Sequence, residues 1–227
     1  LATEKTFAAD MRVQFTPTLL FFDEEGRVIL RLNGYIPPHN FKLALDYVSG
    51  GKESDISYRD YLAQNRPAQP KGALQRQPFF MSSPFDLQQR EDKPLIVLFE
   101  QIQCPHCDRL HQELLSDPSV RGLLENYDVV QLDMWSNTPV VKADGERTNA
   151  RSWARQLKVN FAPTLILFDR QGEEIIRSEA VFKRFHTESI LDYGLNDAYR
   201  DQPSFQRFLS ARSERIREQG KDVDIWR

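Results

Sequence analysis

The sequence predicts an α/β fold in which a central mixed sheet is flanked by helices, preceded by a partial second unit of the same kind. Two observations carry this prediction. Residues 94–99 form a continuous apolar run, which is typical of a strand in the middle of a sheet, and a helix start follows a few residues later. Residues 13–23 recur 146 positions further along the chain, which indicates a duplicated supersecondary unit.

Composition narrows the class of protein. The 227 residues carry a net charge of −3, with 40% hydrophobic residues and 28% charged residues of both signs. This balance gives no reason to expect nucleic acid or an anionic membrane surface as a partner. No apolar run approaches the roughly 18 residues that indicate a transmembrane helix. We therefore expect a globular chain with room for two domains and no membrane segment.

The repeat can be followed residue by residue. Residues 13–23 read VQFTPTLLFFD and residues 159–169 read VNFAPTLILFD, and the alignment continues without a gap into a closing helix. Each copy predicts a helix, a strand entered through a proline, a turn, a second strand and that closing helix. The same offset places a counterpart of Cys104 about 42 positions before Leu1, so we interpret the first copy as the second half of a domain.

The second copy is predicted to be complete. After the opening strand we expect a helix, a strand, a polar insertion and another helix, at about residues 104–115, 128–132, 136–149 and 150–157. The proline-entered strand then begins at Pro163, and a second strand and the closing helix follow it.

Changes in composition predict the domain boundaries. Residues 64–78 hold clustered Pro and Gly with few apolar anchors, which is typical of a linker. We therefore expect half of a repeat at residues 1–63, a complete domain at 79–200 and a helical extension at 201–227. The extension is predicted to place Pro203 in the first turn of a helix that stops at Gly220 and docks on the domain rather than on a partner. Its apolar stripe comprises Phe205, Phe208, Leu209, Arg212 and Ile216.

Cys104 and Cys107 are the only cysteines, and they lie in the motif Cys104-Pro105-His106-Cys107 at a predicted helix start. The two-residue gap lets both sulfurs lie on the first turn, where they can form a disulfide with each other or present one thiolate to a partner. Unpaired backbone N–H groups and the helix dipole favour the thiolate, which is the nucleophile of thiol–disulfide exchange. We therefore predict redox chemistry, with a buried structural pair or half of a zinc site as alternatives.

The order of elements, the CPHC motif and Pro163, 56 positions after Cys107, resemble the thioredoxin family. The resemblance covers about residues 80–200, and residues 1–50 resemble the latter half of the same fold. It implies a cis peptide bond before Pro163 that faces the disulfide, and an Ala162 backbone that pairs with a substrate strand.

Two features of the motif narrow the resemblance. The Pro105-His106 dipeptide is that of DsbA-type oxidases, but the 56-position spacing leaves no room for the helical domain that DsbA-like proteins insert. The layout is closer to periplasmic thioredoxin-related proteins of the SoxW kind, which have tandem thioredoxin-like units. This implies the periplasm as the compartment, with the cytoplasm as the alternative.

The resemblance also implies roles. Cys104 is expected to be the more exposed nucleophile, Cys107 the resolving cysteine and His106 a group that tunes the thiolate. The implied partners are protein or small-molecule thiols and disulfides, and no cofactor is implied. Thioredoxins carry a Trp directly before the first cysteine and a buried acid six residues before it. These positions hold Gln103 and Leu98 here.

Glu100 is the candidate substitute for the missing buried acid, because it lies four residues before Cys104 at a strand end. A solvated strand-end carboxylate is the alternative interpretation. His111 lies four residues after Cys107, so Cys104, Cys107 and His111 could bind Cu(I) or Zn(II). No fourth ligand accompanies them, and we expect His111 on the helix surface and no metal site. His39 and His186 are likewise expected at the surface.

In the first copy, Pro17 has no CxxC motif to face and is expected to be structural. The strand that follows, residues 19–22, has the sequence of a central strand without its sheet partners, and an exposed apolar strand edge is a pairing hazard. We therefore expect this half-domain to pack on the second domain or to pair with another copy as a homodimer. The alternative function is a binding or scaffold protein built on the two thioredoxin-like surfaces, or a copper-handling protein that uses Cys104, Cys107 and His111.

Overall fold

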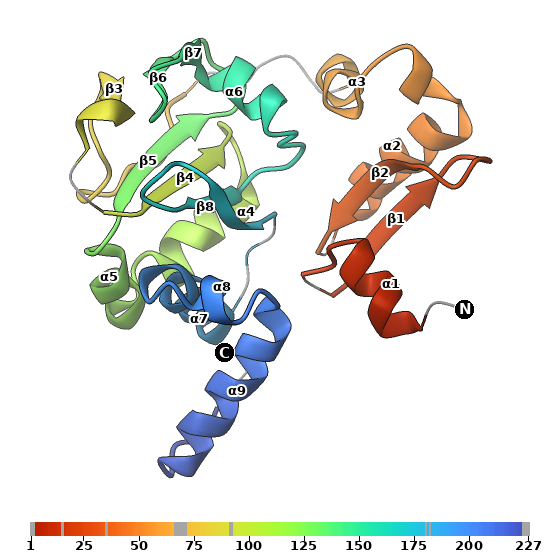
Figure 1. The fold of residues 1–227 in the computed structure, drawn as a ribbon. Helices are drawn as coiled ribbons and strands as arrows, with labels where there is room; N and C mark the ends of the chain where they lie inside the picture. Colours follow the sequence, from red (N-terminus) through yellow and green to blue (C-terminus); the bar gives the residue numbers. More distant parts are fainter. Residues whose placement is uncertain are drawn as a thin grey trace. The chain divides into compact units, whose positions relative to one another are not determined.

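The structure is a computed structural model that describes residues 3–14, 16–34, 36–65, 72–90, 93–179, 181 and 183–223. It divides into two compact units, Leu1–Arg66 (unit 1) and Pro67–Arg227 (unit 2), drawn in Figure 1. The predicted linker falls partly on residues 66–71, which lie outside the described residues. No helix in the described ranges is long and apolar enough to span a bilayer.

Unit 1 places helices around a two-stranded antiparallel sheet of β1 and β2. The Thr3 side chain caps the first helix by accepting a hydrogen bond from the Thr6 backbone N–H. Gly26 allows the turn between the strands, since its φ of +80° lies in the left-handed region. The elements are α1 (Glu4–Asp10), β1 (Thr18–Phe22), β2 (Val28–Asn33), α2 (Pro38–Ser49), a 3₁₀ turn (Lys52–Ser54) and α3 (Tyr58–Asn65).

Unit 2 contains a mixed four-stranded sheet in the order β5-β4-β8-β9 and a smaller sheet in the order β3-β6-β7. In the larger sheet β4 is parallel to β5 and antiparallel to β8. The strands are β3 (Phe85–Asp86), β4 (Leu95–Glu100), β5 (Asp128–Asp133), β6 (Pro139–Val141), β7 (Arg147–Asn149), β8 (Thr164–Phe168) and β9 (Glu174–Ser178). The helices are α4 (Pro105–Arg109), a π turn (Leu110–Leu114), α5 (Pro118–Leu124), α6 (Ala150–Gln156), α7 (Arg184–Leu195), α8 (Ala198–Asp201) and α9 (Phe205–Glu218), with a 3₁₀ turn at Leu87–Gln89.

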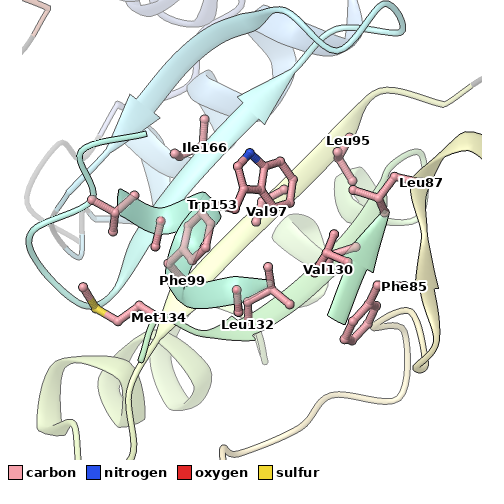
Figure 2. Packing of buried hydrophobic residues seen from close by; sticks show 14 of the residues in the cluster. Phe85, Leu87, Leu95, Val97, Phe99, Val130, Leu132, Met134, Trp153 and Ile166 are labelled. Atoms are coloured by element: carbon pink, nitrogen blue, oxygen red, sulfur yellow. The ribbon is translucent and has the colours of Figure 1, made fainter. Parts of the chain in front are cut away.

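Strand β4 lies in the interior because both of its faces are covered, and all six of its residues are buried. Alternate side chains of a strand point to opposite faces. Val97 and Phe99 pack in the core cluster of Figure 2, where Trp153 of α6 meets Phe99 edge-on at 5.9 Å between ring centroids. Leu98, on the other face, lines a small cavity together with Leu110 of the π turn. Glu100, two positions after Leu98, is thereby directed to the face that carries α4.

The first four elements of unit 1 recur in unit 2 at the spacing of the sequence repeat. α1, β1, β2 and α2 have the bounds of α6, β8, β9 and α7 minus 146, with one residue of difference at the end of β2. The strand pairing repeats as well, because the irregularity between Phe21 and Phe22 recurs between Leu167 and Phe168. The peptide bonds before Pro17 and Pro163 are both cis.

The correspondence extends beyond the closing helix. Tyr47 Oη donates to the Ile56 carbonyl, and Tyr193 Oη donates to the Gln202 carbonyl, each at 2.7 Å. Both tyrosines and both carbonyls are 146 positions apart, so α9 holds in unit 2 the place that α3 holds in unit 1. The α9 helix (Phe205–Glu218) is longer than α3 (Tyr58–Asn65), and residues 224–227, where the sequence ends, lie outside the described residues.

Helix α9 packs on α7, as the sequence predicted for this helix. Phe205 and Phe208 are buried with ring centroids 5.3 and 5.0 Å from that of Tyr193. Arg212 Nε donates to Asp192 Oδ2 at 3.0 Å. The predicted start was early by two residues, because Ser204 is the residue that precedes the helix and Pro203 therefore lies outside it.

The polar segment at 136–149 differs from the expected loop-like insertion. It forms the hairpin of β6 and β7, and β6 also pairs in parallel with β3. Val140, which is 1% exposed, pairs with Phe85 and anchors this small sheet to the core. The hairpin therefore has a buried apolar position, Val140, in a stretch whose composition is mostly polar.

Large exposed hydrophobic side chains among the described residues all belong to unit 1. The repeat allows a direct comparison: Phe7, Phe22 and Leu45 are 47%, 40% and 44% exposed, whereas their counterparts Trp153, Phe168 and Leu191 are 6%, 5% and 0% exposed. Strand β8 pairs with β4 on the edge opposite β9, whereas β1 pairs only with β2 in the described part of unit 1. Unit 1 therefore has an apolar strand edge without the cover that unit 2 provides.

Candidate active site

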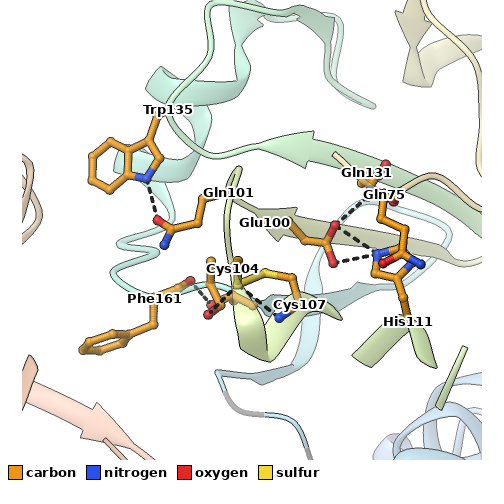
Figure 3. Close-up of a disulfide and its surroundings, with 11 residues drawn as sticks. Gln75, Glu100, Gln101, Cys104, Cys107, His111, Gln131, Trp135 and Phe161 are labelled. Carbon is orange, nitrogen blue, oxygen red and sulfur yellow. Dashed lines mark hydrogen bonds and ion pairs between the residues drawn. A yellow bond between two sulfur atoms is a disulfide. The ribbon is translucent and has the colours of Figure 1, made fainter. Parts of the chain in front are cut away.

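The two cysteines lie where strand β4 passes into helix α4. Gln103, with φ +56°, turns the chain in the left-handed region, and Cys104 is the residue that precedes the first helical turn. Cys104 and Cys107 form a disulfide with their Cα atoms 5.1 Å apart (Figure 3). The backbone N–H of Cys107 donates to Cys104 Sγ at 3.1 Å. Free N–H groups of the first helical turn are thus directed at the sulfur that is the predicted nucleophile.

Ala162 and Pro163 lie directly beside the disulfide. The carbonyl oxygen of Ala162 is 3.6 Å from Cys104 Sγ, although the two residues are 58 positions apart. Pro163 is buried, and Thr164 Oγ1 donates to the Phe161 carbonyl at 2.8 Å, which holds the entry to β8 in place. The structure therefore brings together the two motifs that the sequence placed in one site.

The expected difference in exposure between the cysteines is wrong for this disulfide-bonded state. Cys104 and Cys107 are both 5% exposed. The Ala162 carbonyl lies against Cys104 Sγ, so Cys104 is no more exposed than Cys107 although it is nearer the start of the helix. Pro105 is exposed and His106 is half-buried, so the motif presents its two central residues to the surface.

Glu100 and His111 form a buried pair behind the disulfide. Each residue is 1% exposed, and His111 Nε2 lies 3.0 and 3.2 Å from the two carboxylate oxygens of Glu100. The alternative interpretation of Glu100 as a solvated strand-end carboxylate does not hold, because the side chain is buried. The expectation of His111 on the helix surface was wrong, because its ring turns inward to Glu100. Gln131 of β5 also donates from Nε2 to Glu100.

The far side of this pair is closed by residues that composition had assigned to the linker. Gln77 Nε2 lies 3.0 Å from His111 Nδ1, and the Gln75 carbonyl accepts from Gln131 Nε2 at 2.6 Å. The ring of Phe80 meets the His111 ring edge-on at 5.9 Å. A polar segment without periodicity gives no sign of such contacts, so sequence reasoning missed Gln75 and Gln77. For the pair itself the sequence did offer a signal, because Glu100 and His111 each lie four residues from a cysteine of the CPHC motif.

Both ring nitrogens of His111 have a hydrogen-bonding partner. In the tautomer with its proton on Nε2, the ring donates to the Glu100 carboxylate and Nδ1 accepts from Gln77 Nε2. Both nitrogens of His111 are engaged in this way, and no group of three or more His, Cys, Asp or Glu side chains in the described ranges could hold a metal. The alternative of a site formed by Cys104, Cys107 and His111 thereby loses its histidine.

An aromatic side chain that the sequence analysis did not single out flanks the motif. Trp135, which follows β5, donates from Nε1 to Gln101 Oε1 at 3.0 Å, and Gln101 lies in the loop that leads to Cys104. Figure 3 shows Trp135 beside this loop and Phe161 on the same side of the disulfide. The expected exposure of His39 is confirmed. The expected exposure of His186 was wrong, because this residue of α7 is half-buried, with its ring edge-on to that of Phe185 at 5.7 Å.

Comparison with known proteins identifies the fold. The chain matches the family described as thioredoxin-like domain over residues 2–49 and 83–194. It belongs to the thioredoxin-like domain family. The predicted fold class is thereby confirmed, and the matched ranges of this thioredoxin-like chain include the disulfide, the pair of Glu100 and His111, and Pro163.

Solved structures of thioredoxin-fold proteins resemble this thioredoxin-like chain. A thioredoxin-fold protein from Helicobacter pylori is 17% identical, with a TM-score of 0.47 over 53% of this chain and 81% of that one. A thioredoxin from Thermus thermophilus is 23% identical, with a TM-score of 0.35 over 44% and 72%. The oxidised C-terminal domain of DsbD from Neisseria meningitidis is 13% identical, with a TM-score of 0.37 over 48% and 85%. No curated protein matches the chain.

Proposed function

We propose that this chain is a thiol–disulfide oxidoreductase that exchanges disulfides through Cys104 and Cys107. The observation that supports it best is the disulfide at the start of α4 with the Ala162 carbonyl 3.6 Å from Cys104 Sγ. A catalytic disulfide needs a sulfur at a helix start and a backbone beside it to which a substrate strand can bind. Both lie within one site here, in a chain of the thioredoxin-like domain family.

The reaction proceeds by two displacements at sulfur. A substrate thiolate attacks Cys104 Sγ, the disulfide breaks, and its bonding electrons go to Cys107 Sγ. A second substrate thiolate then attacks the substrate sulfur of this mixed disulfide and releases Cys104 as the thiolate. The substrate dithiol loses two electrons and two protons, and the Cys104–Cys107 disulfide gains two electrons. In the reverse direction, the Cys104 thiolate attacks a substrate disulfide and Cys107 resolves the mixed disulfide.

Four further residues support these steps. Pro105 has its fixed φ in the first helical turn and lacks the N–H that would be unpaired there. His106 adds a dipole or a positive charge beside the Cys104 thiolate and so tunes its reactivity. Ala162 and Pro163 offer the backbone that positions an extended substrate.

Cysteine variants test this proposal. We expect Cys107→Ser to accumulate a mixed disulfide with glutathione or a substrate peptide, detected by mass spectrometry, because the resolving thiol is missing. Cys104→Ser is the matched control and is expected to form none and to lose exchange with insulin. Folded wild-type protein without exchange in either redox direction would contradict the proposal.

We further propose a periplasmic, SoxW-like role, which rests on the resemblance of the CPHC layout and of the repeated units. An equilibrium with glutathione sets the direction, since a disulfide more oxidising than glutathione acts as an oxidase and a more reducing one as a reductase. An oxidising value with efficient oxidation of peptide dithiols supports the periplasmic role. A value as reducing as that of cytosolic thioredoxins contradicts it.

We also propose that a second copy of the chain covers the free edge of β1. In unit 2 the equivalent edge of β8 takes an apolar antiparallel strand, β4. Strand β1 of a second copy is also apolar, and a two-fold axis makes the β1 strands antiparallel. We expect a dimer by size-exclusion chromatography with light scattering that Phe22→Lys converts to a monomer, whereas Lys42→Ala on α2 leaves it intact. A strictly monomeric wild type would contradict this pairing.

A further inference from the structure

We propose that His111 is a positioning residue that acts through Glu100 to set the reduction potential of the Cys104–Cys107 disulfide. This inference rests on the proposed oxidoreductase function. It assigns to the buried pair a task that Leu98, at the usual position of the acid, cannot perform.

The pair flanks the two cysteines in the chain. Glu100 ends β4 four residues before Cys104, and His111 is four residues after Cys107 on the helical segment that continues α4. Residues four apart on a helix lie on the same side of it, so His111 is on the side of the helix that carries Cys107. A π turn at Leu110–Leu114 holds His111 in this place, and such turns are frequent at functional sites. Figure 3 shows the Glu100 side chain running from β4 toward His111 and Gln131, next to the disulfide.

Burial makes the charge of this pair effective. Both side chains are 1% exposed or less, so water screens their charges weakly. When His111 is neutral, the carboxylate of Glu100 is held by two neutral donors, His111 Nε2 and Gln131 Nε2. The thiolate that forms at Cys107 when the disulfide opens is then a second negative charge nearby. A proton on His111 compensates one of these charges and thereby favours the reduced form.

Gln77 can accommodate either protonation state of His111. Its amide carries both a donor and an acceptor. The nitrogen faces an unprotonated Nδ1 at 3.0 Å, and rotation of the amide presents the oxygen to a protonated Nδ1 instead. The segment that closes the pair therefore permits a proton to arrive without leaving a buried polar atom unpaired.

Other titratable groups lie near the pair. They are the same in wild type and in the Glu100 and His111 variants compared below. Asp133 lies opposite Glu100 in the register of β5, and its Oδ1 accepts from the Trp135 backbone N–H. The remaining charged or titratable groups on the described helical segment and on residues 72–80 are His106, Asp108, Arg109, Glu113 and Arg76.

The two partners are expected to have opposite effects on the potential. Glu100→Gln removes the negative charge, so the equilibrium with glutathione should move toward the reduced protein by about tenfold or more. His111→Asn keeps a donor to Glu100 but cannot take up a proton, so the equilibrium should move toward the disulfide by a similar factor. A residue that only maintains the structure would not give shifts of opposite sign.

The test is the equilibrium with glutathione redox buffers, from about pH 5.5 to about pH 8, on either side of the ordinary histidine pKa. Wild type, Glu100→Gln and His111→Asn are compared with His186→Asn, which changes the half-buried histidine of α7. We expect the pH dependence of wild type to contain an inflection that His111→Asn lacks and His186→Asn keeps. Shifts of the same sign in the two site variants, or an unchanged pH profile in His111→Asn, would overturn the inference.

If the variants fail to fold, a second measurement, made on the wild-type protein, still tests the inference. The His111 ring proton is titrated by NMR in the oxidised and reduced protein, and we expect a higher pKa in the reduced protein. Equal pKa values in the two redox states would overturn the inference. Failure of the proposed function itself looks different, because wild type would then show no exchange with glutathione.

Discussion

His111 Nε2 lies 3.0 Å from a carboxylate oxygen of Glu100, and both side chains are shielded from solvent behind the Cys104–Cys107 disulfide. The pair joins the CPHC helix to the end of the central strand. It also replaces, with a carboxylate two positions further along β4, the buried acid whose usual position is held by Leu98. The disulfide therefore has an ionisable group behind it even though the expected position of that group is apolar.

Replacement of His111 by leucine tests how much the pair stabilises unit 2. His111→Leu leaves the Glu100 carboxylate buried without its imidazole donor, and an unsatisfied buried group costs about 1–3 kcal/mol, with more for a charged one. We expect the free energy of unfolding to fall by at least this amount in urea denaturation at neutral pH. Glu113→Gln, at an exposed position of the same π turn, is the control and should change it little.

A double substitution separates the two contributions to the loss of stability, the unpaired charge of Glu100 and the changed packing at His111. In the double variant Glu100→Leu and His111→Leu, no polar group remains unpaired at the pair itself. Most of the lost stability should return, and a double variant that is less stable than His111→Leu alone would contradict this account.

Phe205 tests whether α9 is part of unit 2. Its side chain is 0% exposed and packs on Tyr193. We expect Phe205→Ala to lower the free energy of unfolding by about 3–5 kcal/mol, the usual cost of truncating a buried Phe. Gln206→Ala, the exposed neighbour on α9, should be nearly neutral. A near-neutral Phe205→Ala would mean that the helix is an independent extension.

Gly194 and Gly122 both lie in helices, and we expect their replacement by alanine to change stability in opposite directions. A Cβ at Gly194 in α7 would lie 2.2 Å from Leu167 Cδ2 and 3.1 Å from Tyr127 Oη, so Gly194→Ala should destabilise unit 2 by about 1–3 kcal/mol through overpacking. Gly122 in α5 has nothing within 4 Å of the same position. Gly122→Ala should stabilise the protein by about 0.5–1 kcal/mol, because alanine is the better helix former. Thermal unfolding of both variants measures the contrast.

The pKa of the buried Tyr193 leads to a prediction of how the free energy of unfolding changes at alkaline pH. Burial raises the pKa of Tyr193 to about 12, above its ordinary value of 10.0. A raised pKa stabilises the folded state fully below the unfolded value, and this contribution is lost as pH rises from 10.0 to about 12. We expect the free energy of unfolding to decrease through this window, and less steeply in Tyr193→Phe. An equally steep decrease in Tyr193→Phe would assign the effect to other groups.

Local signals were enough for much of the architecture. The apolar run at 94–99 became a strand buried on both faces because its composition leaves no polar face for solvent. The repeat placed four pairs of elements almost to the residue, since equal side chains at equal spacing form the same turns and strands. The CPHC motif and Pro163 identified the two segments that meet at the disulfide.

Other features depended on residues far apart in the chain. The hairpin at 139–149 pairs with β3, where Val140 lies opposite Phe85, and the polar composition of the segment does not indicate this contact. The closure of the Glu100 and His111 pair by Gln75 and Gln77 required a segment that resembles a linker. Side chains of glutamine carry no pattern that distinguishes a solvated amide from one that completes a buried network.

The sequence by itself thus determined the fold class, the internal repeat and the position of the CPHC motif, because these follow from apolar patterning and from spacing along the chain. Only the tertiary structure decided that Glu100 and His111 are buried together and that α9 repeats the place of α3. It also showed that unit 1 exposes side chains whose counterparts unit 2 buries. The physical reason is that burial depends on which distant elements cover a residue, and the same apolar strand is core beside β4 and an exposed edge without it.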